Sequence, residues 1–235
     1  GSTIIFSAND VTNGTELWKS DGTLAGTVLV KDIRPGSSSS SPNNFVVMGG
    51  FVYFTANDGT VGGALWRTDG TLAGTTLVKD VNTSSTTSSS FIGELTAIGS
   101  KLYFRGWDST NGEEPWVSDG TPGGTAILKS IRPGTGSSSA INTGVELTGC
   151  FGTFEFVEFN GFVYFNANDG SNSGGQNSEL WRTDGTTAGT VLFKDNYSFG
   201  GGGPGNLVNA GTFLFFTSDN QSTTGFEPWK TDGTA

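Results

Sequence analysis

Short apolar runs separated by polar, turn-forming residues recur along the whole chain. In the stretch from 45 to 81, each run holds β-branched and aromatic residues and is bounded by Gly, Asn, Asp, Ser or Thr. Such runs predict β-strands, because branched and aromatic side chains pack well on a pleated surface and the bounding residues favour turns. Four strands are expected in this stretch, at 45–48, 51–54, 65–67 and 75–81.

The third strand of this group carries a motif that occurs five times. Its first copy is Glu-Leu-Trp-Lys-Ser-Asp-Gly-Thr at 16–23, and the later copies begin at Ala64, Glu114, Glu179 and Glu227. Successive tryptophans of the motif are 48, 50, 65 and 48 residues apart. A period of this length is typical of propeller blades, each of which is a four-stranded sheet.

The lengths of the links support the same architecture. Links inside 45–81 are short enough for antiparallel hairpins, whereas the polar link 82–90 is long enough to lead from an outer strand to the next sheet. We therefore predict an all-β chain with a single domain at 1–235, a β-propeller of about five four-stranded antiparallel blades. The repeat units are approximately 1–44, 45–90, 91–150, 151–203 and 204–235.

The two ends of the array are incomplete in this pattern. The first unit lacks its innermost strand and the last lacks its outermost strand, which leaves 18 strands in all. Either a five-bladed ring closes with two imperfect blades, or the chain is a piece of a longer propeller or repeat array. We favour the second interpretation, a piece of a longer array. The first and last units both contain the second and third strands of a blade, so they do not combine into one complete blade.

Composition excludes several classes of protein. Thirty-eight glycines and only 14% charged residues argue against long helices. A formal net charge of −10, with 12 scattered basic residues, argues against nucleic acid as a partner. No run approaches the ~20 apolar residues of a membrane helix. Without histidine, imidazole catalysis and histidine-bound zinc are excluded, and the single cysteine, Cys150, is interpreted as a buried or incidental loop residue.

Tryptophan is the first candidate for binding chemistry, since an exposed indole suits a sugar ring. A residue required once per sheet is more often a wedge between sheets, so we interpret the motif tryptophans as structural and expect their N–H groups to bond to backbone carbonyls. Trp107 lies outside the motif, in an expected loop, and is the candidate for surface binding. The structural tryptophans are Trp18, Trp66, Trp116, Trp181 and Trp229.

Acidic residues offer two further hypotheses. Aspartate before glycine is explained by turn chemistry, because its carboxylate accepts a backbone hydrogen bond and glycine supplies a positive φ. These turn residues are Asp21, Asp69, Asp119, Asp184 and Asp232. A second acidic set flanks the loop before the motif, and hard oxygen ligands on such loops suit Ca²⁺, although their spacing varies. These weak calcium candidates are Asp10, Glu16, Asp108, Glu114, Asp169, Glu179, Asp219 and Glu227.

Three glutamates, Glu94, Glu155 and Glu158, depart from the repeat in the expected first strands of their units. A pair of carboxylates across a cleft, one with a raised pKa, would suit glycoside hydrolysis. Residues three apart on a strand point to opposite faces, so Glu155 and Glu158 cannot face each other. Apart from the Ca²⁺ of the calcium hypothesis, we expect no cofactor. We also expect no catalytic residue.

The motif resembles that of the ELWxxDGT-repeat proteins, large bacterial secreted or surface proteins. Glu16-Leu17-Trp18 and Glu179-Leu180-Trp181 match directly, as do all five Asp-Gly-Thr turns. Ala64 replaces the glutamate in one copy, and Pro115 and Pro228 replace the leucine in two others. The resemblance implies a propeller-like repeat in an exported protein, sometimes beside adhesion or sorting domains, with no catalytic residues to transfer.

Together these observations predict a non-enzymatic, extracellular or cell-surface scaffold. Its loops would contact glycans, surface proteins or other copies of the chain, in adhesion or surface assembly. The alternative is a carbohydrate-active enzyme, a glycoside hydrolase or lyase, on a propeller scaffold.

Overall fold

The computed structural model describes residues 3–83, 91–134, 138, 155–170, 178–195, 203–219 and 225–234. Every regular element in these ranges is a β-strand, and the strands form five antiparallel sheets. Cys150 and most of the long loop before Glu179 lie outside the described residues. The prediction of an all-β, propeller-type fold is confirmed by this succession of meander sheets.

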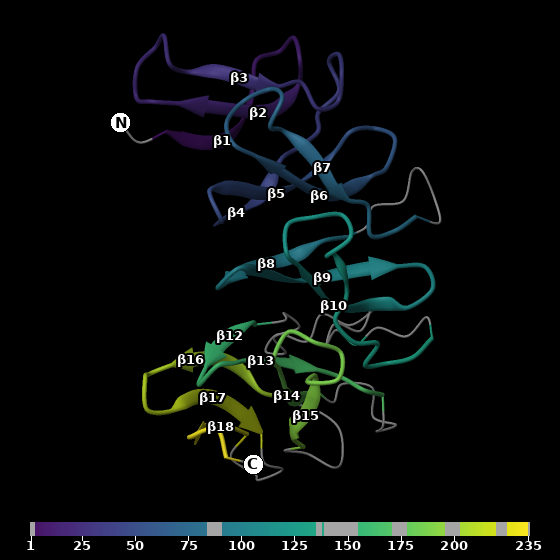
Figure 1. Ribbon diagram of the computed structural model, residues 1–235, viewed down its shortest axis with the longest axis vertical. Coiled ribbons are helices and arrows are strands. Elements are labelled where there is room, and N and C mark those ends of the chain that lie inside the picture. Colours follow the sequence, from purple (N-terminus) through teal and green to yellow (C-terminus); the bar gives the residue numbers. More distant parts are fainter. Residues whose placement is uncertain are drawn as a thin grey trace. The chain divides into compact units, whose positions relative to one another are not determined.

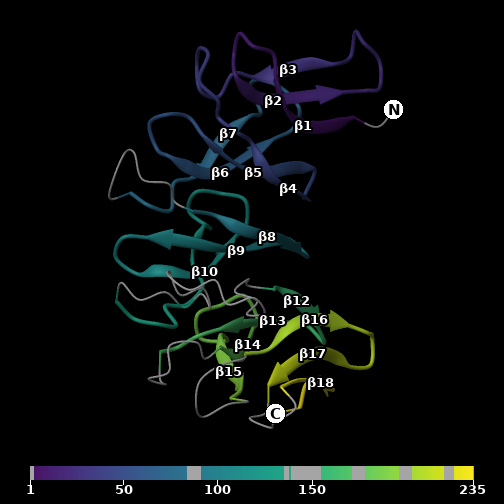
Figure 2. The same cartoon turned by 180° about the vertical axis from the view of Figure 1, so that it is seen from behind.

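In each sheet the strands follow one another in chain order, as Figure 1 shows and Figure 2 repeats from behind. The first sheet contains β1 (Ile4–Asn9), β2 (Thr15–Ser20) and β3 (Val28–Lys31). The second contains β4 (Asn43–Met48), β5 (Phe51–Asn57), β6 (Gly63–Thr68) and β7 (Thr76–Lys79). The third contains β8 (Gly93–Ile98), β9 (Lys101–Asp108), β10 (Gly112–Ser118) and β11 (Ala126–Ile127).

The last two sheets have the same order. The fourth contains β12 (Val157–Phe159), β13 (Phe162–Ala167), β14 (Glu179–Thr183) and β15 (Val191–Lys194). The fifth contains β16 (Gly205–Asn209), β17 (Leu214–Asp219) and β18 (Phe226–Thr231). The first and fifth sheets thus have three strands each and the others four, as the sequence pattern predicts.

Glycine-containing pairs close the hairpins between the first two strands. Gly49 and Gly50 have φ angles of 58° and 83°, and Asn160 and Gly161 have 53° and 79°. Two consecutive positive φ angles are those of a type I′ turn, whose twist matches that of the flanking strands. The hairpin turns therefore fix the register of each following strand.

A bulge recurs where the motif strand pairs with the last strand of its sheet. In the second sheet Leu65 pairs with Lys79 but Trp66 pairs with Leu77, so Val78 is the extra residue. Register shifts at the same motif position occur in the first and fourth sheets. A bulge changes the direction in which the side chains of its strand point, and the side chain of Val78 is buried here.

The chain forms two compact units, one of residues 1–102, 106–108 and 118–126, the other of 103–105, 109–117 and 127–235. In the first unit Leu17 and Val30 of the first sheet pack with Phe54 and Trp66 of the second. The second unit repeats this packing between its fourth and fifth sheets, where Figures 1 and 2 show β12 beside β16. In each unit the hydrophobic core described above therefore lies between two consecutive sheets.

No helix among the described residues is long and apolar enough to cross a membrane.

Candidate functional site

The Asp-Gly-Thr segments form a repeated loop, here called the aspartate turn, that begins at the Ser or Thr before the aspartate. In the second copy, one carboxylate oxygen of Asp69 accepts hydrogen bonds from the backbone N–H (2.9 Å) and the hydroxyl (2.7 Å) of Thr71. The hydroxyls of Thr68 and Thr75 close the base of the loop at 2.7 Å. The same bonds recur in the first, third and fourth copies.

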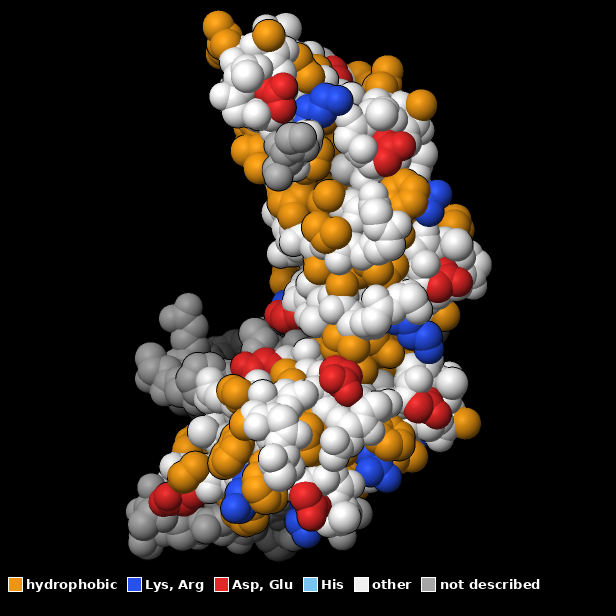
Figure 3. Space-filling model, turned by 60° about the vertical axis from the view of Figure 1, so that its left-hand side comes forward, with side chains coloured by type: hydrophobic (Ala, Val, Ile, Leu, Met, Phe, Trp, Pro, Cys, Tyr) orange, Lys and Arg blue, Asp and Glu red, His pale blue; other side chains and the backbone are white. Residues whose placement is uncertain are grey.

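A second glycine makes the aspartate turn compact. A β-carbon on Gly74 would lie 2.1 Å from a carboxylate oxygen of Asp69, so only glycine fits there. The bonds from the threonine hydroxyl and backbone hold the pKa of Asp69 below its usual value. The same cause lowers the pKa of Asp21, Asp119 and Asp232. On the face that Figure 3 shows, the acidic side chains form separate patches. Each of the first four turn aspartates accepts its bonds from the threonine of its own turn.

The motif glutamate has a different task, because its carboxylate is buried beneath the link to the next sheet. Glu16 accepts hydrogen bonds from the backbone N–H groups of Ile33 (2.8 Å) and Ser40 (2.7 Å). Glu114 accepts bonds from Ile131 and Arg132, each at 3.0 Å. A buried carboxylate with such donors fixes an otherwise irregular link against the strand.

The held link in turn joins two sheets through backbone bonds. The N–H of Ser41 bonds to the Thr15 carbonyl at 3.1 Å, and the Ser40 carbonyl accepts a bond from Asn57 of the next sheet at 2.9 Å. Ser138 repeats the arrangement between Glu113 and Asn168, with both distances at 2.8 Å. Glu16 and Glu114 are therefore placed as structural groups.

Glu179 is buried like Glu16, but the position matching Ile33 lies at 196, outside the described residues. Burial, with the Asp169 carboxylate nearby, raises the pKa of Glu179 to about 8. In the second copy Ala64 replaces the glutamate and is itself buried.

The calcium candidates are not gathered into one site in the described part of the chain. Asp10 accepts bonds from the backbone of Thr12 and Asn13 and from the Asn13 amide, and so closes its own loop. Glu227 is only partly buried at the chain's last strand. No group of three acidic or cysteine side chains that could hold a metal occurs among the described residues. The remaining candidates, Asp108, Asp169 and Asp219, lie at or just after the ends of the second strands.

The motif tryptophans lie between sheets. Trp66, Trp116 and Trp181 are buried, whereas Trp18 and Trp229 are partly exposed. The N–H of Trp229 bonds to the Ser218 carbonyl at 3.1 Å. No carbonyl of the described residues accepts a bond from the N–H of Trp18, Trp66, Trp116 or Trp181, so the expected carbonyl partner is wrong for these four.

Trp107 is not in a loop, contrary to the sequence prediction. It belongs to β9 and is half-buried, because this second strand extends to Asp108. Arg105 and Gly106 follow Phe104 and interrupt the apolar run, so the sequence pattern predicted a strand that ends at Phe104.

Of the three glutamates that depart from the repeat, Glu155 and Glu158 accept backbone hydrogen bonds. Glu155 accepts a bond from the N–H of Leu207 at 2.7 Å, which ties its segment to the next sheet. Glu158 is exposed and accepts a bond from Gly161 in the adjacent hairpin at 3.0 Å. Glu94 has a φ of 51° at a strand position shared with Asn44 and Asn206, which have φ angles of 55°. Glu94 therefore lies where the repeat bends its first strand, whereas Glu155 lies before β12 and Glu158 within it.

Two sets of basic residues connect consecutive repeats, and sequence reasoning missed both. Lys31 bonds to the Thr75 carbonyl at 2.9 Å and lies 5.8 Å from the Trp66 ring centre; Lys129 does the same with Thr190 and Trp181. The signal was present, because a lysine follows each of the first four motif tryptophans by 13 residues. The second set follows the tryptophan directly: Lys19, Arg67 and Arg182 bond to the carbonyls of Gly70, Gly120 and Gly233.

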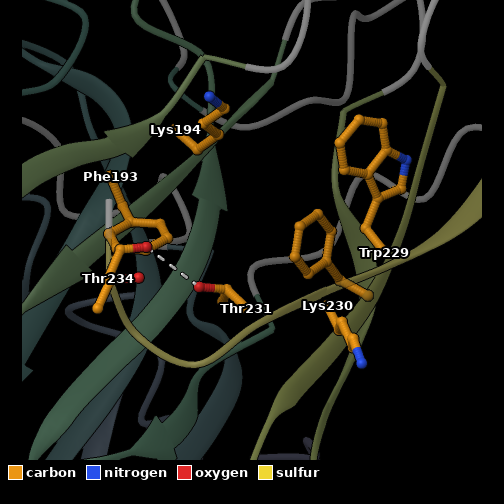
Figure 4. A pocket seen from close by; sticks show the side chains of 7 residues that line it. Phe193, Lys194, Trp229, Lys230, Thr231 and Thr234 are labelled. Atoms are coloured by element: carbon orange, nitrogen blue, oxygen red, sulfur yellow. Dashed lines mark hydrogen bonds between the residues drawn. The ribbon is translucent and has the colours of Figure 1, made fainter.

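A hollow of about 180 Å³ lies beside β18. Figure 4 shows Phe193 and Thr234 on one side of it and Trp229 on the other, with Lys194 beyond. Thr231 donates a 3.4 Å bond to the Thr234 carbonyl at its edge. The hollow is mostly apolar, and the partly exposed Trp229 forms part of its wall.

Comparisons with known proteins show the fold but not a family. No protein family and no curated protein matches the chain. A putative TolB from Agrobacterium tumefaciens is 13% identical, with a TM-score of 0.49 over 100% of this chain and 75% of that one. A prolyl endopeptidase is 12% identical, with a TM-score of 0.50 over 97% of this chain and 33% of that one. An endo-arabinase from Bacteroides thetaiotaomicron is 13% identical, with a TM-score of 0.36 over 98% of this chain and 89% of that one. These neighbours are β-propeller proteins, a class that includes enzymes and non-enzymes.

Proposed function

We propose that the chain is a non-enzymatic scaffold of an exported, ELWxxDGT-type repeat protein, and that it acts by presenting its loops to a binding partner. One observation carries the proposal: the recurring carboxylates hold the chain's own backbone. Asp69 closes its turn, and Glu16 and Glu114 hold the links between sheets. Groups that are engaged in this way support a rigid frame and are not free for acid–base chemistry.

The aspartate turns offer a surface for binding. Leu24 and Leu72 project from the tips of the first two turns and are among the most exposed apolar side chains of the chain. Exposed apolar residues on rigid, repeated loops favour contact with another macromolecule. The expected partners are surface glycans, surface proteins or further copies of the chain.

Binding is tested with immobilised glycans and with extracellular-matrix or cell-surface preparations, using the wild-type chain and two variants. Leu24→Ser with Leu72→Ser removes the apolar turn tips, and Trp107→Ala removes the half-buried tryptophan. Loss of binding in the turn-tip variant alone would support the turns as the contact surface. Equal binding by the wild type and both variants would contradict the turns as the contact surface. The absence of binding by all three proteins would contradict it as well.

A carbohydrate-active enzyme is the second candidate, and Glu179 is the observation that favours it. Its pKa of about 8 and the nearby Asp169 resemble the acid of a carboxylate pair. Against this, Glu179 occupies the motif position at which Glu16 and Glu114 hold links. Turnover of a polysaccharide that Glu179→Gln abolishes, while binding persists, would establish the enzyme and overturn the scaffold.

Export is proposed from the resemblance alone and is tested by fractionating cells of the source organism with an antibody against the chain. Signal only in the cytoplasmic fraction would contradict it.

A further inference from the structure

Asparagine followed by glycine is a sequence pair that can lose its side-chain amide without an enzyme. The backbone nitrogen of the glycine attacks the side-chain carbonyl carbon of the asparagine, and the missing β-carbon of glycine leaves the approach open. The chain contains three such pairs, Asn13-Gly14, Asn111-Gly112 and Asn160-Gly161, and all three lie among the described residues. The surroundings of each pair therefore determine which of them reacts.

Two of the three pairs are enclosed by the fold. Gly14 is buried, and a β-carbon there would lie 2.9 Å from the backbone of Ser38. The side-chain amide of Asn13 donates to a carboxylate oxygen of Asp10 at 2.6 Å. Gly112 is also buried, at the first residue of β10. A buried backbone nitrogen reaches the side chain only after its segment opens, so both pairs are protected.

The third pair is exposed at the tip of the hairpin between β12 and β13. Both Asn160 and Gly161 are exposed, and no atom lies within 4 Å of the β-carbon position of Gly161. Two hydrogen bonds hold the tip: the Asn160 amide donates to the Asp232 carbonyl at 3.1 Å, and the Gly161 N–H donates to Glu158 at 3.0 Å. Because both bonds lie at the surface, the tip opens without disturbing the core.

Asn160 is also a contact between two repeats. Gly49 and Gly99 occupy the same position in the second and third sheets, with φ angles of 58° and 60° against 53° for Asn160. A glycine has no side chain that could reach the following aspartate turn. The Asn160 amide is therefore both the reactive group and a hydrogen bond between the fourth and fifth sheets.

We propose that Asn160 is a site of spontaneous deamidation, and that the reaction weakens the joint between the fourth and fifth sheets. The Gly161 nitrogen gives up its proton to solvent base and forms a bond to the Asn160 side-chain carbonyl carbon. The bond from that carbon to the amide nitrogen breaks, and the nitrogen leaves as ammonia. Water then opens the five-membered succinimide ring to aspartate or isoaspartate. Nothing in this step depends on what the chain binds.

Both products lose the contact with the Asp232 carbonyl. An ionised carboxylate only accepts hydrogen bonds, so it has no proton to offer that oxygen. Isoaspartate also adds a methylene group to the backbone within the two-residue turn, whose geometry sets the pairing of Phe159 with Phe162. The joint is left with the bond from Arg182 to the Gly233 carbonyl.

Peptide mapping by mass spectrometry tests the site. Wild-type chain is kept in mildly alkaline buffer at body temperature, folded or in concentrated urea, and deamidation is followed at all three asparagines. In the folded chain we expect the reaction at Asn160 to be about tenfold faster, or more, than at Asn13 or Asn111. In urea the three rates should become similar. Equal rates in the folded chain, or the same excess at Asn160 in urea, would overturn selection of this site by the fold.

Unfolding by urea tests the consequence. Ageing should lower the unfolding midpoint of the wild type, and fresh Asn160→Asp should show a lowered midpoint without ageing. Asn160→Gly, which carries the residue of the second and third sheets, is the matched control, because it keeps the positive φ and has no amide to lose. Its midpoint should not change on ageing. An aged wild type that is deamidated at Asn160 but keeps its midpoint would overturn the weakening of the joint.

Discussion

The hydroxyl of Tyr53 lies directly beneath Gly120 of the following aspartate turn. A β-carbon on Gly120 would be 2.0 Å from this oxygen, closer than any real contact. Gly120 also has a φ of 88°, in the left-handed region. The turn glycine therefore serves both its own loop and the packing of the preceding repeat.

This relationship predicts the effect of replacing Gly120. We expect Gly120→Ala to lower the free energy of unfolding by about 2–4 kcal/mol, from the positive φ together with the clash. Gly22→Ala is the matched control, since Gly22 has a φ of 90° but open space at the β-carbon position among the described residues. Urea unfolding measures both; equal losses would show that the Tyr53 contact has no effect. Tyr53→Phe should recover part of the loss in Gly120→Ala.

Removal of the carboxylate beneath the first link gives a second prediction. Glu16→Ala leaves the buried N–H groups of Ile33 and Ser40 without their acceptor and should cost about 2–4 kcal/mol. Amide exchange at Ile33 and Ser40, followed by NMR, should accelerate in the variant. Unchanged protection at both amides would contradict the role assigned to Glu16.

Acid stability follows from the aspartate turns. Their pKa values are lowered in the folded chain, so the folded state binds fewer protons than the unfolded one. The stabilisation is present above the unfolded value of 3.8 and is lost as pH falls through the lower folded values. Asp69→Asn should therefore reduce the loss of stability on acidification. Urea midpoints that fall equally in both proteins as pH drops would contradict this.

Glu179 should produce the opposite dependence. Its folded pKa of about 8 lies above the unfolded value of 4.5, so its contribution is fully present below pH 4.5 and is lost as pH rises through 8. Glu179→Gln should leave stability at pH 4 nearly unchanged and raise it at pH 9 relative to wild type. Thermal midpoints of wild type and Glu179→Gln, measured at pH 4 and pH 9, check this. The same difference between the two proteins at both pH values would contradict a raised pKa of Glu179.

Local patterns determined how much of this structure could be predicted from the sequence. The strands and the Asp69 turn follow from neighbours in the chain, so apolar runs and turn chemistry were sufficient. The role of Glu16 depends on Ile33 and Ser40, which are 17 and 24 residues away in an irregular link. No periodicity identifies such partners, and the sequence alone does not distinguish a glutamate that holds a link from one that binds Ca²⁺.

Contacts between sheets were harder still to predict. Lys31 reaches Trp66 and Thr75 of another repeat, and only the spatial arrangement of the two sheets brings them together. The hollow beside Trp229 was missed for the same reason, since Phe193 and Thr234 belong to different repeats.

The bridges made by Lys19, Lys31 and Arg182 each connect a repeat only to its immediate neighbour. Stability in such an array is close to a sum over repeats and their nearest-neighbour joints. A gene that duplicates or deletes a whole repeat therefore leaves every remaining joint with its partners, so length can change over evolution without redesign of the core.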